Sequence, residues 1–253
     1  MIKAWLKKLP VLLLIIAFAS FTFPRTTFAA IAYGASTDGD NFGGSSTQVT
    51  WTSPSVSGSN TVGLVGIVIR GTSPTVTSVT WNGVSMTIAP SSSITANSRM
   101  AVWYYLANPA AGATTIVVNG TNFSRIFTHA VYYTGVDQTT PVLDVSTGSN
   151  TATSGITGNF TLTNNNEYIH DAVVTAFDCT GITLSVGTRD SSRCDGNGTS
   201  AAFGYQGPLA SGAQTMVWSD GTTNHTRSGL GINPSVVSSG YLAKQEIIAY
   251  LEE

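Results

Sequence analysis

The first residues that could do chemistry are three oxygen ligands close together near the start of the chain. Asp38-Gly39-Asp40-Asn41 offers two carboxylates and one amide oxygen, and Ca²⁺ is bound by such hard oxygen atoms. The run lacks both the full spacing of a calcium loop and the glutamate that closes one. We interpret Asp38, Asp40 and Asn41 either as a structural calcium site or as a solvated turn. A second oxygen-rich group for the same ion comprises Asp190, Asp195 and Asn197.

Aromatic side chains form the second group with possible chemistry. Alternation along a strand at 100–106 places Trp103 and Tyr105 on one face and Tyr104 on the other. Either the sheet is covered on both sides, or one aromatic row is open to a ligand. Flat apolar rings bind the C–H faces of sugars, so we name Trp81, Trp103 and Tyr105 as candidate glycan-binding residues. The alternative is that they belong to the core.

The sequence offers few residues that could act in catalysis. His170 and Asp171 are neighbours in a predicted strand, so their side chains leave opposite faces and do not pair directly. His129 shares a strand face with Phe127 and Tyr133. Glu167 and Asp171 share a face but lie roughly 13 Å apart along a strand, which exceeds the separation of the carboxylates in a glycosidase. With neither a G-x-S-x-G elbow nor an H-E-x-x-H motif, we predict that the protein is not an enzyme.

The two cysteines of the chain, Cys179 and Cys194, permit a single disulfide. Closing a loop of about 15 residues stabilises the fold by roughly 3 kcal/mol in the chain-entropy model. Disulfides persist outside the cytoplasm, where other features of the sequence place this chain. A redox or metal role would be expected to show a C-x-x-C pattern or a nearby histidine, and the sequence has neither.

An internal repeat indicates how the strands that carry these residues are organised. Residues 101–117 align without a gap to residues 201–217, and seven of the pairs are identical. Self-similarity at a fixed spacing is the mark of a duplicated unit. The identical pairs are Ala101/Ala201, Tyr105/Tyr205, Ala110/Ala210, Gly112/Gly212, Ala113/Ala213, Thr115/Thr215 and Val117/Val217.

The local pattern is that of short strands separated by turns. Segments rich in Val, Ile, Thr and Trp follow one another at the even spacing of a sandwich or jelly roll. Asn82-Gly83 stands between two of them and predicts a hairpin with a type I′ turn. The predicted strands of the first half are 47–52, 62–69, 76–81, 84–88, 100–106, 114–118 and 125–133. In the second half we expect strands at 160–162, 168–177, 182–186 and 226–232, besides those of the repeat.

These patterns predict an all-β, jelly-roll-like β-sandwich built from two homologous halves. The first half spans 30–136 and the second 137–236, with no flexible linker between them. Whether the halves form one sandwich or two stays open. Residues 237–253 are a C-terminal tail rich in helix formers, which we interpret as a short helix or as an assembly segment.

The N-terminus predicts export. Three lysines precede an apolar run and then Thr27-Phe28-Ala29, the pattern of a secretory signal peptide at 1–29. This run is too short to span a bilayer, so contact with a membrane is expected only through the signal peptide. Cleavage leaves seven basic and thirteen acidic side chains, a net charge of −6. An acidic surface repels phosphate backbones, so nucleic acid is excluded as an expected partner.

Three segments together resemble a widespread, poorly characterised β-sandwich module of secreted bacterial surface proteins and phage structural proteins. They are Val79-Thr-Trp-Asn-Gly-Val-Ser-Met-Thr87, Trp103-Tyr-Tyr-Leu-Ala-Asn-Pro109 with Gly112, and Tyr133-Thr-Gly-Val-Asp-Gln-Thr-Thr-Pro141. The likeness spans most of residues 31–236. Its motifs are signatures of turns and packing, so the resemblance implies a fold and an extracellular setting but no catalytic residue.

We therefore expect a secreted, non-catalytic module that binds a glycan or a cell-surface ligand, as an adhesin does. The first alternative is a structural subunit of an extracellular layer or fibre, which self-assembles through edge strands or the tail. The second alternative is a glycoside hydrolase. No cofactor is predicted besides the possible structural calcium.

Overall fold

The computed structural model describes residues 26–41, 46–151, 154–176, 181–196, 198–221 and 224–238. All regular elements in these ranges are β-strands, which confirms the predicted all-β class. Within the same ranges, no helix has the length and apolar character needed to cross a membrane. The chain divides into two compact units, one from Ala29 to Ser235 and one formed by the segments on either side of it.

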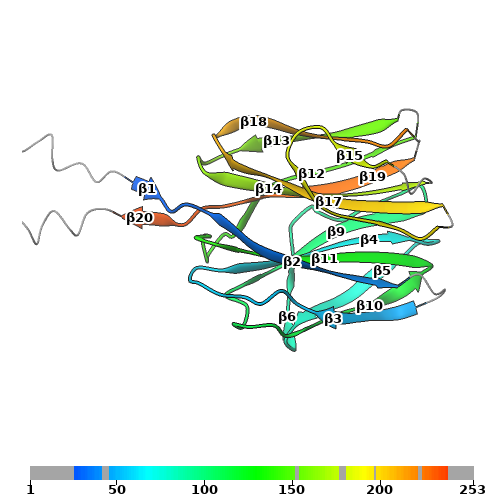
Figure 1. Ribbon diagram of the computed structural model, residues 1–253, viewed down its shortest axis with the longest axis horizontal. Helices are drawn as coiled ribbons and strands as arrows, with labels where there is room; N and C mark the ends of the chain where they lie inside the picture. The colour runs from blue at the N-terminus through cyan, green and yellow to red at the C-terminus, as the bar shows by residue number, and fades with distance from the viewer. Residues whose placement is uncertain are drawn as a thin grey trace, which may run out of the picture. The chain divides into compact units, whose positions relative to one another are not determined.

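The first half of the larger unit contains two antiparallel sheets (Figure 1). The outer sheet has the order β3 (Ser46–Thr52), β10 (Thr115–Phe123), β5 (Thr75–Trp81) and β6 (Val84–Ser85). The inner sheet has the order β2 (Ala32–Asn41), β11 (Arg125–Thr134), β4 (Val62–Arg70), β9 (Arg99–Ala107) and β7 (Thr87–Ile88), and β8 (Ile94–Ala96) also pairs with β9.

The second half repeats this order. Its inner sheet runs β12 (Val142–Asn150), β19 (His225–Ile232), β14 (Glu167–Ala176), β17 (Thr199–Leu209) and β16 (Thr188–Cys194). Its outer sheet runs β13 (Gly155–Leu162), β18 (Gly212–Ser219) and β15 (Thr183–Leu184). Thus β2-β11-β4-β9 corresponds to β12-β19-β14-β17, and β3-β10-β5 corresponds to β13-β18-β15. The repeated order supports the predicted duplication, which stays an inference.

The four sheets lie in layers, and the two inner sheets face each other (Figure 1). Each half has a core between its own two sheets. A third core lies between the inner sheets and takes residues from both halves, among them Trp103 of β9 and Phe203 of β17. The halves are therefore two sandwiches joined by a shared apolar layer.

This layering explains the two kinds of strand in the sequence. The inner strand β4 is an almost continuous apolar run, and eight of its nine residues are buried, as expected when both faces of a sheet are covered. The outer strand β13 alternates between buried and exposed residues, because one of its faces meets solvent. Burying one Val, Leu or Ile side chain contributes about 1.5–3 kcal/mol, so strands like β4 supply much of the stability.

The predicted hairpin at Asn82-Gly83 is confirmed. Both residues have positive φ, 52° and 75°, as a type I′ turn requires, and Trp81 pairs with Val84 across the turn. A second turn of the same kind was not predicted. It joins β8 to β9 through Asn97 and Ser98, with φ of 52° and 57°.

In the larger unit, four strands were missed from the sequence: β2, β8, β12 and β16. The turn predicted at Asp38–Asn41 is wrong, because these residues form the end of β2. β2 and β12 contain Gly, Asp and Asn, which are depleted in strands, and β8 has only three residues. Such strands form because a neighbouring strand offers its backbone hydrogen bonds. For β2 and β12 that neighbour is β11 or β19.

The smaller unit contains one pair of short strands. β1 (Thr26–Phe28) runs antiparallel to β20 (Val236–Ser238). The signal peptide predicted for residues 1–29 includes β1, so cleavage after Ala29 would leave β20 without this partner. Residues 1–25 and 239–253, which hold most of the predicted signal peptide and tail, lie outside the described residues.

Candidate functional site

The aromatic residues predicted to bind a glycan do not form an open surface. Trp81 and Trp103 are both 0% exposed, which corrects their assignment as ligand-binding residues. Trp81 lies in the core of the first half, and the indole of Trp103 donates to the carbonyl of Ser228, 2.8 Å away, across the shared core. Tyr105 is partly buried against the same core. The sheet that carries Trp103 and Tyr105 is covered on both faces, which was the alternative left open by the sequence.

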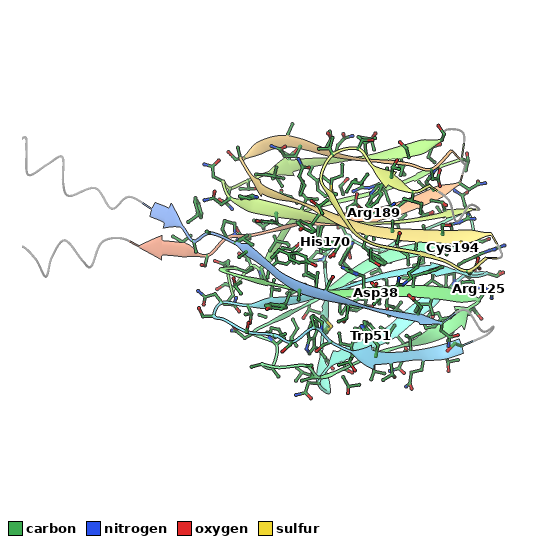
Figure 2. All side chains as sticks on the ribbon, in the orientation of Figure 1. Asp38, Trp51, Arg125, His170, Arg189 and Cys194 are labelled. Carbon is green, nitrogen blue, oxygen red and sulfur yellow. The ribbon has the colours of Figure 1, made fainter. Side chains whose placement is uncertain are left out.

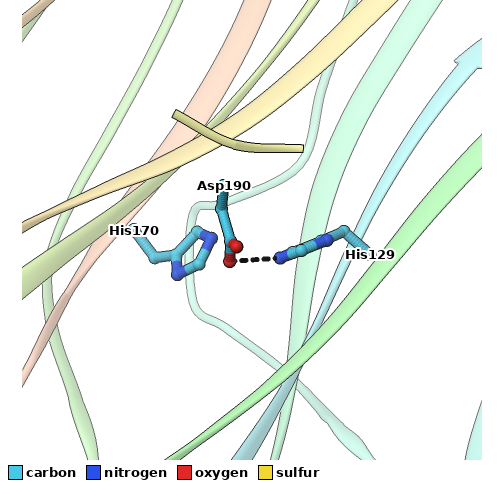
Figure 3. Close-up of side chains that lie close together, drawn as sticks. All are labelled: His129, His170 and Asp190. Atoms are coloured by element: carbon cyan, nitrogen blue, oxygen red, sulfur yellow. Dashed lines mark hydrogen bonds and ion pairs between the residues drawn. The ribbon is translucent and has the colours of Figure 1, made fainter. Parts of the chain in front are cut away.

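The shared core contains a polar network centred on His129. His129 is fully buried in β11, and its two ring nitrogens lie 2.7 Å from Asp38 Oδ1 and 2.9 Å from Asp190 Oδ2. Figure 3 shows Asp190 between the rings of His129 and His170. The hydroxyl of Tyr33 donates to both oxygens of Asp190 at 2.9 Å. Both halves of the protein therefore contribute to one connected group.

His170 completes the network from β14. Its Nδ1 lies 2.9 Å from the hydroxyl of Tyr133. Its Nε2 is buried and has no hydrogen-bond partner among the described residues. An unsatisfied polar atom in a core costs about 1–3 kcal/mol, so this nitrogen stands out from its surroundings.

Two predictions about these strands are confirmed. His129 lies on the face of β11 that holds Phe127 and Tyr133 in the shared core. His170 and Asp171 leave opposite faces of β14. The imidazole of His170 contacts Tyr133, whereas the carboxylate of Asp171 accepts hydrogen bonds from Trp218 and Arg227 inside the second half.

The charges of the network are set by its neighbours. Burial lowers the pKa of His129, but its hydrogen bonds to Asp190 and Asp38 outweigh burial and raise this pKa above its usual value. Burial raises the pKa of Asp190, but the hydrogen bond and charge of His129 outweigh burial and lower this pKa to about 2. Burial and repulsion from His129 lower the pKa of His170 to about 3. These shifts favour the protonated form of His129 between the two carboxylates and the neutral form of His170.

The residues predicted to bind calcium have other partners. Asp38 accepts hydrogen bonds from His129, Ser191 and Arg193. Asp40 accepts one from Arg193 at 2.9 Å, so a guanidinium already lies between the two carboxylates. Asn41 ends the strand. Of the second predicted group, Asp190 belongs to the histidine network, Asp195 forms an ion pair with Arg125, and Asn197 lies outside the described residues.

A row of three arginines, which sequence reasoning missed, crosses the inner sheet of the first half. Arg125 pairs with Arg70 across β11 and β4, and Arg70 pairs with Arg99 across β4 and β9. Directly paired residues point to the same face, so three positive charges lie side by side. The signal was present in the sequence: Arg70 directly follows the predicted strand 62–69, Arg99 directly precedes 100–106 and Arg125 begins 125–133. Antiparallel pairing of these strands brings the three residues together.

Two arginines of the row, Arg70 and Arg125, line a hollow of about 500 Å³. Figure 2 labels Arg125 toward one end of the layered fold, whereas Asp38 and His170 lie nearer its middle. We call this hollow the arginine pocket. It is lined by Arg70, Gly71, Thr72, Ser98, Ser124 and Arg125.

The charges of the arginine row are only partly neutralised by the described residues. Arg125 pairs with Asp195 at 2.8 Å. Arg70 donates to the hydroxyl of Thr199 at 3.0 Å, which is uncharged. Arg99 is 7% exposed, and its Nε has no partner among the described residues. Burial and the charge of Arg70 lower the pKa of Arg99. An anion in the arginine pocket would relieve this repulsion.

The backbone of the arginine pocket is held in place by close packing. A Cβ added to Gly71 would lie 2.1 Å from the carbonyl oxygen of Asn122, so only glycine fits there. The amide of Gly71 donates to the carbonyl of Ser98 at 3.0 Å, and Ser98 belongs to the type I′ turn between β8 and β9. These contacts fix the backbone of this part of the pocket wall.

The carboxylates considered for a glycosidase have separate structural roles. Glu167 and Asp171 are both fully buried. Glu167 accepts a hydrogen bond from the amide of Asn164, and Asp171 is held by Arg227 and Trp218. Neither of them lines the arginine pocket.

Glu167 makes stability depend on pH. Burial and the charge of Asp144 raise the pKa of Glu167 from 4.5 to about 7, although a hydrogen bond from Asn164 opposes this. Between these values the unfolded chain releases a proton that the folded chain keeps, so stability falls as pH rises. We expect wild type to lose about 2 kcal/mol more than Glu167→Gln between pH 4.5 and pH 8. Urea unfolding at both pH values measures this difference, and equal losses would contradict it.

The predicted disulfide falls partly outside the described residues. Cys194 ends β16, which pairs with β17, whereas Cys179 lies outside the described residues. The pairing of the two cysteines stays a prediction.

No family model, curated protein or solved structure matches this chain. The resemblance to the β-sandwich module of surface and phage proteins therefore stays a prediction, and the site must be interpreted from its own geometry.

Proposed function

We propose that this protein is an exported, non-catalytic binding module, and that its arginine pocket holds an anionic group of a ligand at the cell exterior. The ligand class we favour is an acidic glycan bearing carboxylate or sulfate groups. The observation that carries the proposal is that Arg125 and Arg70, neighbours in the row of three arginines, line one polar hollow. Guanidinium groups bind carboxylate and sulfate oxygens through paired hydrogen bonds.

The net negative charge of the protein favours small acidic ligands over long polyanions at this site. After loss of the predicted signal peptide the chain carries a net charge of −6, so a long polyanion is repelled by most of the surface. A single acidic group in the pocket meets two arginines, together with the hydroxyls of Thr72, Ser98 and Ser124. This balance favours a short acidic determinant over nucleic acid. The proposal keeps the predicted glycan-binding function but assigns it to the arginine pocket instead of the aromatic residues.

The proposal is tested by an array of neutral, uronate-containing and sulfated glycans, with the mature chain as the analyte. We expect binding to acidic glycans that weakens as salt increases. Arg70→Gln should lower affinity for the best acidic glycan about tenfold or more, because a hydrogen bond to a charged group contributes about 1.5–3 kcal/mol. Titration calorimetry with that glycan measures the change.

The matched control is Arg189→Gln, which makes the same change in charge at an exposed residue outside the arginine pocket. Its affinity should stay within about twofold of wild type. The proposal fails if no acidic glycan binds, or if the two variants lose affinity equally. The alternative of a layer or fibre subunit stays a prediction, to be checked by light scattering at high protein concentration.

A further inference from the structure

We propose that His129, His170 and Asp190 form a structural binding site for Zn²⁺ between the two halves of the protein. Each residue offers one ligand atom, and these atoms all lie within 4.8 Å of one another. The site is separate from the arginine pocket, and the proposal does not depend on the proposed function.

The geometry points to a metal because a ring nitrogen of each histidine lies close to the carboxylate of Asp190. His129 Nε2 lies 2.9 Å from Asp190 Oδ2, and His170 lies on the other side of Asp190 (Figure 3). Ligands about 2.0–2.1 Å from a tetrahedral zinc ion are roughly 3.3 Å apart. Small side-chain rotations therefore suffice to bring the three atoms to this spacing.

The buried Nε2 of His170 is the second, independent observation. It has no hydrogen-bond partner among the described residues, although its residue is 0% exposed. A metal ion would satisfy this nitrogen directly. It would also take the place of the proton that His129 shares with Asp190.

The surroundings of the two histidines match those of metal ligands. In metal sites the second ring nitrogen of a ligating histidine is usually held by a carboxylate or another polar group. Here Asp38 lies 2.7 Å from Nδ1 of His129, and Tyr133 lies 2.9 Å from Nδ1 of His170. In both rings Nδ1 is therefore engaged, which leaves Nε2 as the nitrogen available to a metal.

The ligand types and the burial select the ion and its role. Two imidazoles and one carboxylate suit zinc better than calcium or magnesium, which prefer oxygen ligands. Both histidines are fully buried and the side chain of Asp190 is only 11% exposed, so the site leaves little room for a substrate and the ion would be structural. It would connect β11 of the first half to β14 and β16 of the second, and would stabilise the packing of the inner sheets.

The test uses the full mature chain, freed of metal with a chelator and then titrated with Zn²⁺. We expect one equivalent to bind, measured by elemental analysis after gel filtration. At a Zn²⁺ concentration 100 times the Kd, the melting temperature should rise by about 5–10 °C. Co²⁺ in place of Zn²⁺ should give the visible absorption of a low-symmetry site.

Asp190→Asn is the main variant, because it keeps the size of the side chain and its hydrogen bond to Tyr33. It should fold but lose both the bound metal and the rise in melting temperature. His225→Gln is the matched control, since His225 is a buried histidine that pairs with Asp220 outside the three-residue group, and it should bind Zn²⁺ as wild type does. The proposal is overturned if wild type retains no zinc, or if Asp190→Asn binds it equally well.

Discussion

Replacing Arg227 with Met is expected to lower the free energy of unfolding by about 3–5 kcal/mol, because it leaves a buried carboxylate without its cation. Arg227 and Asp171 are both fully buried, and two guanidinium nitrogens lie 3.0 Å from Asp171 Oδ2. Burial raises the pKa of Asp171 even though Arg227 and Trp218 oppose this. Urea unfolding at pH 7 measures the loss.

A double variant and a control separate the unpaired charge from lost packing. Arg227→Met combined with Asp171→Leu removes both charges, and most of the loss should be recovered, as happens when apolar residues replace a buried ion pair. Arg193→Met removes a partly exposed arginine that also contacts carboxylates, and should cost at most about 1 kcal/mol. Equal losses in Arg227→Met and Arg193→Met would contradict the prediction.

Trp103→Ala should destabilise the protein by about 3–5 kcal/mol, the range for removing a large buried aromatic side chain. Trp103 is 0% exposed and contacts both halves, since its ring lies edge-on to Phe203 with centroids 6.2 Å apart. The substitution would leave a cavity in the shared core. It would also remove the hydrogen bond to Ser228. Urea unfolding monitored by circular dichroism measures the effect.

Trp103→Phe is the matched variant, because phenylalanine occupies the corresponding position, 203, in the second half. Trp103→Phe should lower the free energy of unfolding clearly less than Trp103→Ala, since most of the ring volume remains. Val84→Ala truncates a side chain that is 54% exposed and should change stability by less than about 0.5 kcal/mol. If Trp103→Ala lowered the free energy of unfolding no more than Val84→Ala, the shared core would not contribute to stability as we expect.

The fold class was predictable because most strands carry local signals. The apolar run at 62–69 and the Asn82-Gly83 turn are properties of neighbouring residues, so they could be identified without any tertiary contact. Strand β2 could not be identified in this way. Its sequence, Ala-Tyr-Gly-Ala-Ser-Thr-Asp-Gly-Asp-Asn, is polar, and it becomes a strand because it pairs with β11 along almost its whole length.

The candidate sites were less predictable than the fold. Asp38 was predicted from the sequence as a calcium ligand or turn residue. His129 and His170 were each considered from the sequence, but neither was connected to the other or to Asp38. These residues form one network only because segments far apart along the chain, such as those of Asp38 and Asp190, come close together when the inner sheets pack. The same applies to Trp103. A strand pattern shows that its two faces differ, but it does not show which of them is covered by another sheet.

The sequence by itself determined most of the strands: apolar alternation and turn residues act over a few positions, so they specify strands, hairpins and a repeated plan. Only the tertiary structure decided what those elements enclose. The two inner sheets pack face to face, which buries Trp103 and brings His129, His170 and Asp190 together, whereas Trp81 is buried between the two sheets of the first half. The physical reason is that burial and charge pairing depend on distances in space between residues that are distant in the chain.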